Sequence, residues 1–175
     1  MEKPQASHPK SPNELTAVVI TVSDSAARGA RADESGPRVA GILEEKGFTV
    51  ISRSTVRDDV SDIEQALRTA APSARLVVTT GGTGLGPRDV TPEATRAACD
   101  RLVDGLAERI RAAGSAQTPF AVLSRGVCGT LGSTLIVNLP GSPRGAGESL
   151  ATIVDVLPHA LDLLAGKTQH KETTA

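Results

Sequence analysis

The sequence contains almost no aromatic residues. It has 175 residues but no Trp or Tyr, and Phe48 and Phe120 are its two aromatic side chains. Proteins that bind single-stranded nucleic acids generally stack bases on aromatic rings, so this scarcity argues against that class. The net charge is −1, so the chain also lacks an overall positive field that would attract nucleic acid or an anionic membrane. We therefore expect neither as a partner.

Histidine and lysine are also scarce. Of three His, only His159 lies outside the polar ends, which is too little for a His-built zinc site or a Ser-His-Asp triad. Of five Lys, only Lys46 is far from the ends, so a phosphate-binding loop of the Walker type is excluded. Fourteen Arg, in contrast, are spread through the chain. A site for anions must then use Arg, backbone N–H groups or a metal ion.

The sequence offers no disulfide framework and no long apolar run. Two Cys, Cys99 and Cys128, are typical of small apolar residues in a reducing cytoplasm. The longest apolar runs, such as 17–20, have the length of strands and are too short to span a membrane. Residues 1–13 contain three Pro and no apolar stretch, so no signal peptide is predicted. We expect a cytoplasmic protein.

The chain length and the apolar pattern predict one α/β domain. At about 100–200 residues per domain, we expect a single domain over residues 14–166, with disordered tails at 1–13 and 167–175. Runs rich in β-branched residues predict strands, the second of them nearer an edge of the sheet because it alternates. These strands are predicted at 15–22, 48–56, 75–80, 121–124 and 135–139.

Helix-capping residues separate these strands. Ser35, Ser61, Thr91 and Ser142 are each placed to cap a helix, and a further helix is predicted over 104–113. Strands that alternate with helices favour a three-layer α/β/α sandwich with a mostly parallel central sheet. In such sheets ligands bind beyond the carboxyl ends of the strands.

The loop after the strand at 75–80 is the strongest candidate site. Gly81, Gly82 and Gly84 surround Thr83, and their lack of side chains lets backbone N–H groups approach an anion. We interpret the loop as a cradle for nucleotide phosphates, with Arg88 supplying charge and Asp89 binding a metal ion. The alternative is a flexible turn in which Arg88 and Asp89 form a solvated pair.

Two acidic segments are expected at the same edge. Ser23 and Asp24 follow the first strand, and Asp58 and Asp59 follow the second, where adjacent carboxylates suit a divalent cation. These acids are equally explained as turn residues that favour the start of a helix.

The loop after the last strand contains Gly141, Ser142, Pro143 and Arg144 at the start of a helix, which is a natural anion site. The alternative is that Ser142 only caps the helix. Arg125 stands among Ser and Gly residues further back. Together these groups suit phosphoryl or nucleotidyl transfer, in which positioning and charge neutralisation matter most.

Three motifs resemble the MogA/MoaB family of molybdenum cofactor biosynthesis and the N-terminal type of domain in gephyrin. They are 80–84 with 88–95 (TGGTG and RDVTPEAT), 138–143 (NLPGSP), and the loop 23–37, and the resemblance covers about 15–165. It implies a molybdopterin adenylyltransferase that transfers AMP from ATP to the terminal phosphate of molybdopterin and releases pyrophosphate, with Mg²⁺. It also implies a homotrimer, and a partner protein that inserts molybdenum.

The resemblance implies roles for individual residues. Asp89 and Asp58 correspond to essential acids that would hold Mg²⁺, although Arg57 replaces a usual Pro, so that Asp59 is the alternative to Asp58. Substrate binding is expected from Ser23, Asp24, Gly81, Gly82, Thr83, Gly84, Arg88, Arg125, Gly141, Ser142, Pro143 and Arg144, with Arg125, Ser142 and Arg144 toward the pterin phosphate. Two other functions stay open: a molybdopterin-binding paralogue without efficient catalysis, and a hydrolase of nucleotide pyrophosphates.

Overall fold

The computed structural model describes residues 14–167, and within them six strands form one sheet. The predicted tails lie outside the described residues, apart from Lys167. The strands are β1 (Thr16–Val22), β2 (Thr49–Val56), β3 (Leu76–Thr80), β4 (Arg101–Leu102), β5 (Cys128–Leu131) and β6 (Thr134–Leu139). Their order is β2-β1-β3-β6-β5-β4. The first four in this order are parallel, whereas β5 and β4 are added antiparallel.

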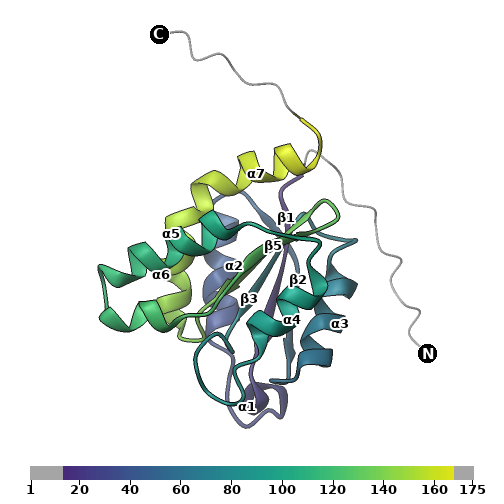
Figure 1. Cartoon of the computed structure of the whole chain (residues 1–175). Coiled ribbons are helices and arrows are strands. Elements are labelled where there is room, and N and C mark those ends of the chain that lie inside the picture. Colours follow the sequence, from purple (N-terminus) through teal and green to yellow (C-terminus); the bar gives the residue numbers. More distant parts are fainter. Residues whose placement is uncertain (1–13, 168–175) are drawn as a thin grey trace, which may run out of the picture.

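Helices cover both faces of the sheet (Figure 1). One layer holds α2 (Ser35–Glu45), α5 (Asp104–Ser115), α6 (Pro143–Ile153) and α7 (Leu157–Leu164), and the other holds α3 (Val60–Ala70) and α4 (Thr91–Ala98). Short helices complete the chain: α1 (Asp24–Ala27), η1 (Pro119–Leu123) and η2 (Val154–Val156). The expected three-layer sandwich is therefore confirmed. No helix of residues 14–167 has both the length and the apolar character to cross a membrane.

The central strands supply both cores. Every residue of β1 and β3 is buried, and alternate side chains point to opposite layers. Val19 and Val78 pack under α2 and α6, whereas Ile20 and Val77 pack under α3 and α4. Strand β2 is largely exposed and pairs with β1 alone, so its expected place near an edge is confirmed. This burial holds the carboxyl ends of β1, β3 and β6 in fixed register.

One predicted strand and several predicted caps are wrong. Residues 121–123 belong to η1 and Ser124 follows it, because Pro119 and the Thr118 hydroxyl, which accepts from the Phe120 N–H, start a helical turn. The strand that pairs with β6 on the side away from β3 is β5, which the sequence reasoning missed. Helix α3 is capped by Asp59 and not by Ser61, because the carboxylate accepts from two backbone N–H groups.

Of the other three expected caps, two are wrong and one is confirmed. Ser35 and Thr91 are the first residues of α2 and α4, so the residues at the cap position are Glu34 and Val90. The hydroxyls of Ser35 and Thr91 bond elsewhere. Ser142 does cap α6, as expected, by accepting from the Gly145 N–H.

Candidate functional site at the carboxyl ends of the parallel strands

The loops that follow the four parallel strands meet at one edge of the sheet, at the lower end of Figure 1 near α1. They enclose a cavity of about 430 Å³. Its walls come from the ends of β1 and β3, from the segment before α2, and from the start of α6. Among the residues predicted from sequence, those lining it are Ser23, Asp58, Gly81, Gly82, Gly141, Ser142 and Pro143. The edge of the sheet where the site was expected therefore contains a cavity in the structure.

The close approach of three loops explains the glycine at position 81. Gly81 has φ +93°, and a Cβ atom there would lie 2.4 Å from the carbonyl oxygen of Val22. Its N–H donates to the Leu139 carbonyl at 3.1 Å, so the loop after β3 is pressed against the ends of β1 and β6. A side chain at this position is excluded by contact and by conformation.

Hydroxyl groups form the buried floor of the cavity. The Ser35 and Thr80 hydroxyls lie 2.8 Å apart, and Thr21 donates to Asp33 Oδ2 at 2.8 Å. The other Asp33 oxygen accepts from the Gly36 N–H at the start of α2. The site residues expected from sequence did not include these four, although Asp33, Ser35 and Thr80 lie within the motifs of the family resemblance. A polar residue at the carboxyl end of an otherwise apolar strand, as at Thr21 and Thr80, is the signal that would have found two of them.

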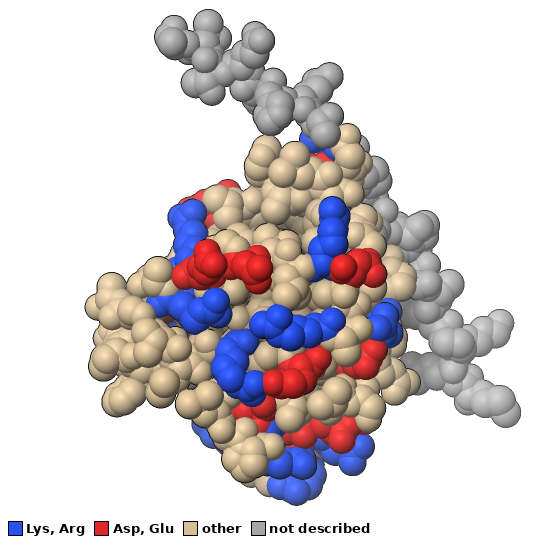
Figure 2. All heavy atoms as spheres, in the orientation of Figure 1, with Lys and Arg blue, Asp and Glu red and all other residues tan. Residues whose placement is uncertain are grey.

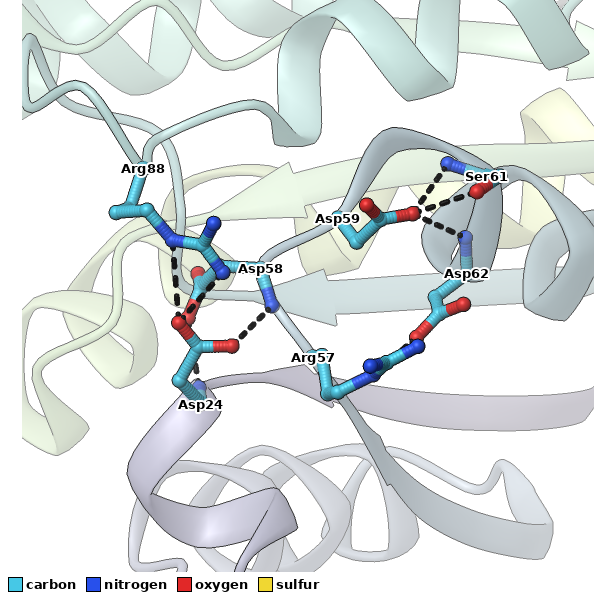
Figure 3. Close-up of polar contacts among 7 residues, drawn as sticks. All are labelled: Asp24, Arg57, Asp58, Asp59, Ser61, Asp62 and Arg88. Carbon is cyan, nitrogen blue, oxygen red and sulfur yellow. Dashed lines mark hydrogen bonds and ion pairs between the residues drawn. The ribbon is translucent and has the colours of Figure 1, made fainter.

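Two aspartates join the ends of β1 and β2 (Figure 3). The Asp24 N–H donates to Asp58 Oδ2 at 2.7 Å, and the Asp58 N–H donates to Asp24 Oδ1 at 3.1 Å. Arg88, from the loop after β3, donates to the remaining Asp24 oxygen at 2.7 Å. Three segments far apart in sequence therefore converge on one carboxylate pair.

The pKa values of the two carboxyls in this pair are shifted in opposite directions. The hydrogen bond from Arg88 is the main cause that lowers the pKa of Asp24. Burial is the main cause that raises the pKa of Asp58, and the negative charges of Asp24 and Asp89 raise it further. A positive ion beside Asp58 would relieve this repulsion. The free site therefore holds Asp58 where its charged form is disfavoured.

Asp58 and Asp59 have separate positions. Asp59 Oδ1 accepts from the N–H groups of Ser61 and Asp62 and from the Ser61 hydroxyl, so it turns toward α3 (Figure 3). These bonds lower the pKa of Asp59. Asp58, in contrast, lines the cavity. Of the two acids that the sequence left open, Asp58 is the one at the edge where the loops meet.

Asp89 is held by its own loop. Its Oδ2 accepts from the Gly86 N–H at 2.8 Å, and its N–H donates back to the Gly86 carbonyl at 2.9 Å. A Cβ atom at Gly84 would lie 2.9 Å from Asp89 Oδ2, so that glycine leaves room for the carboxylate. Asp89 is close enough to Asp58 to affect its pKa.

The donor set suits a metal ion that arrives with its substrate. Residues 14–167 contain no group of three or more His, Cys, Asp and Glu side chains that could hold a metal ion unaided. Mg²⁺ is commonly bound by one or two carboxylates together with substrate phosphates and water. Asp58 and Asp89 fit this pattern.

The family described as "Probable molybdopterin binding domain" matches residues 18–159. This chain belongs to that family. The molybdopterin adenylyltransferase of Helicobacter pylori strain J99 is 36% identical over 152 residues, which are 85% of this chain and 86% of that protein. The molybdenum cofactor synthesis protein cinnamon of Drosophila melanogaster is 40% identical over 86% of this chain, but the match covers only 26% of that longer protein.

Solved structures of family members have the same fold. The molybdopterin biosynthesis enzyme MoaB of Thermus thermophilus superposes with a TM-score of 0.82 at 48% identity, over 87% of this chain and 98% of that one.

A bifunctional molybdenum cofactor biosynthesis protein of Synechococcus elongatus is 39% identical over 86% of this chain and 47% of its own length. This chain thus spans about a quarter and about half of the two longer relatives.

The remaining candidate residues of this family member lie outside the main cavity. Thr83 and Gly84 line a neighbouring cavity of about 500 Å³, on the side of η1 and α6. Arg88 faces Asp24. Arg125 is directed at protein atoms of the loop 81–90 and of α4. Arg144 is exposed and pairs with Glu148 at 2.7 Å.

Proposed function

We propose that this protein is a molybdopterin adenylyltransferase, which transfers AMP from ATP to the terminal phosphate of molybdopterin and releases pyrophosphate. The observation that carries the proposal is the position of Asp58 beside the glycine loop at one cavity, with Asp24 bonded to Asp58 and Asp89 close enough to affect its pKa. Membership of the family supports it, as does the likeness to a relative named for this activity.

The residues at the cavity suit binding of two anionic substrates. Backbone N–H groups of the loop 82–84 and the start of α6 at Ser142 offer donors to phosphate oxygens. The attacking group is itself a phosphate anion, so no strong base is required. Among the described residues that line the cavity none is aromatic. The adenine and pterin rings must then be held by backbone polar groups, hydroxyls and aliphatic side chains.

Mg²⁺ is part of the proposal. Asp58 and Asp89 each use one carboxylate oxygen to accept from a backbone N–H, of Asp24 and Gly86 respectively. Their other oxygens would hold the ion, which supplies charge neutralisation of the phosphates. The raised pKa of Asp58 means that the free site gains from a neighbouring positive charge.

We further propose a homotrimer that works in the cytoplasm with a separate molybdenum-inserting protein. Residues 113–124 contain no charged side chain, and Figure 2 shows the corresponding end of the molecule without blue or red atoms. Within this segment Phe120 is 74% and Val122 63% exposed, which suits burial against another subunit. The sedimentation mass of the full chain tests the trimer. The bifunctional relative supports a partner whose domain is fused there.

The activity is tested by incubating the full chain with ATP, Mg²⁺ and molybdopterin. We expect pyrophosphate and adenylylated molybdopterin, measured by an enzyme-coupled assay and by mass spectrometry. Asp89→Asn is expected to reduce both strongly while binding of molybdopterin is kept. Tight pterin binding by the wild-type chain without pyrophosphate release would indicate the binding paralogue instead. Cleavage of ADP-ribose without pterin would indicate the hydrolase.

A further inference from the structure

Arg125 lies between η1 and β5, far in sequence from the loop that it touches. Its backbone N–H donates to the Thr83 carbonyl at 2.8 Å. Its guanidinium donates to the Gly84 carbonyl at 2.7 Å, to the Asp89 carbonyl at 2.5 Å, and to the Glu93 carboxylate at the start of α4. Within residues 14–167, the side-chain hydrogen bonds of Arg125 all go to the loop 81–90 or to α4, which follows it.

The loop itself has few other attachments. Its two ends are bonded to the sheet and to each other, by Gly81 to Leu139 and by Thr91 to Gly82. Between them, residues 85–88 are exposed and form no helix or strand, and Arg88 donates to Asp24 at 2.7 Å. Arg125 binds the carbonyls on either side of this exposed excursion, at Gly84 and Asp89. The guanidinium therefore fixes the separation of the Gly84 and Asp89 carbonyls, and with it the position of Asp89.

Arginine is the side chain suited to this arrangement. A guanidinium offers five N–H donors in a rigid fork, whereas the ammonium of Lys is a compact donor on a flexible stem. Three acceptors are held here by three different nitrogens, Nε, Nη1 and Nη2. A Lys side chain would keep the charge but could not donate to the Gly84 and Asp89 carbonyls at the same time.

We infer that Arg125 is a positioning residue for adenylyl transfer, which holds the Asp89 carboxylate in place through the carbonyls of Gly84 and Asp89. The inference rests on the proposed function. From sequence alone Arg125 was expected on the pterin phosphate. In the structure its guanidinium faces the loop, so its effect on the reaction passes through Asp89.

The first test compares Arg125→Lys with Arg111→Lys in the full chain. Arg111 lies beside Arg125 in the same polar hollow but donates to the Gly126 carbonyl instead of the loop. We expect Arg125→Lys to lower kcat by about 10- to 100-fold, as for loss of an orienting partner, with KM for molybdopterin little changed. Arg111→Lys should keep both values. A raised KM for molybdopterin with unchanged kcat would overturn the inference.

A double-mutant cycle separates positioning from direct contact. Once Asp89→Asn has removed the group that Arg125 positions, adding Arg125→Lys should reduce the residual rate by less than about twofold. Equal losses with and without Asp89 would mean that Arg125 acts on the substrate, contrary to the inference.

Amide hydrogen exchange tests the same contact without any activity. We expect faster exchange at residues 84–89 in Arg125→Lys, with protection of β1 and β3 and the melting temperature retained, and no change in Arg111→Lys. Glu93→Gln is the second variant. It removes the negative charge of the Glu93 partner and leaves the loop carbonyls bonded, so it should show the same effect to a smaller degree. Unchanged exchange in both Arg125→Lys and Glu93→Gln would overturn the inference. A wild-type chain without adenylyl transfer would defeat the proposed function alone.

Discussion

Asp24 and Asp58 exchange hydrogen bonds, each accepting on its carboxylate from the backbone N–H of the other. The exchange ties the end of β1 to the end of β2 and places two negative groups side by side. Arg88 compensates one of them, whereas Asp58 has no such partner in the described part of the chain and has a raised pKa. The pair therefore carries repulsion that a bound cation would relieve.

Asp58→Asn should weaken catalysis and strengthen the fold. Asn keeps the shape and can still accept from the Asp24 N–H, but it cannot bind Mg²⁺ as an anion. We expect at least about a 100-fold loss of kcat/KM for adenylyl transfer, the size typical of removing a charge-stabilising group. Removal of the repelled charge should raise the melting temperature at neutral pH, a common relation between active-site residues and stability. A lower melting temperature would contradict this account.

The stability gain should depend on pH. Because the folded pKa of Asp58 is raised, the unfolded chain loses this proton first as pH rises, so the folded state becomes less favoured between the unfolded and folded pKa values. Well below about pH 4, the ordinary Asp value, both states are protonated and wild type and Asp58→Asn should melt together. Their melting temperatures should separate as pH increases from the unfolded pKa to the folded pKa. The variant that keeps the charge, Asp58→Glu, should not show the gain.

Arg88→Gln should move the acidic limb of the pH–rate profile. The positive charge of Arg88 lowers the pKa of both Asp24 and Asp58. Without it, both carboxyls should take up protons at higher pH, and kcat/KM should start to fall at higher pH than in wild type. Arg57→Gln is the matched control, because Arg57 pairs with Asp62 on the outer side of the same turn (Figure 3). A shift of equal size in both variants would contradict a specific role for Arg88.

Asp59→Ala should separate the two adjacent acids. Asp59 caps α3 and its pKa is lowered by those bonds, so its contribution to stability is present above the unfolded pKa and is lost as pH falls through the folded value. We expect a lower melting temperature at neutral pH, approaching that of wild type in acid, with kcat retained. Asp59→Asn, which can still cap, should melt near wild type. Loss of kcat in Asp59→Ala while Asp58→Asn stays active would reverse the assignment.

The parts of the site that could be predicted from sequence are those that depend on local pattern. Three glycines directly after an apolar strand indicate a close backbone approach, and the parallel sheet then brings Asp58, Asp89 and Ser142 to one edge. The bonds between Asp24 and Asp58 could not be predicted, because they depend on the pairing of β1 with β2. The contacts of Arg125 cross more than 30 residues and leave no trace in spacing.

The errors in secondary structure have different origins. Residues 121–124 are apolar enough for a strand, but Pro119 and Thr118 favour a helical turn. The hydroxyl of Ser35 was expected to cap its own helix, yet the Thr80 hydroxyl from a distant strand competes for it and lies 2.8 Å away. The first error overlooked a helix signal that lies next to the segment, whereas the second depends on a contact between residues far apart in sequence.

Gly81→Ala should damage the site by moving a loop. The new Cβ atom would lie 2.4 Å from the Val22 carbonyl, at a backbone φ of +93° that L-residues rarely adopt. We expect a loss of about 1–3 kcal/mol in the free energy of unfolding from the strained backbone alone, together with loss of adenylyl transfer. Gly41→Ala is the control, because Gly41 lies inside α2 with open space around it and should gain up to about 1 kcal/mol. Denaturant unfolding measures both. Wild-type stability in Gly81→Ala would show that the loops after β1 and β3 are not pressed together, and the approach of Arg88 to Asp24 across these loops would need another cause.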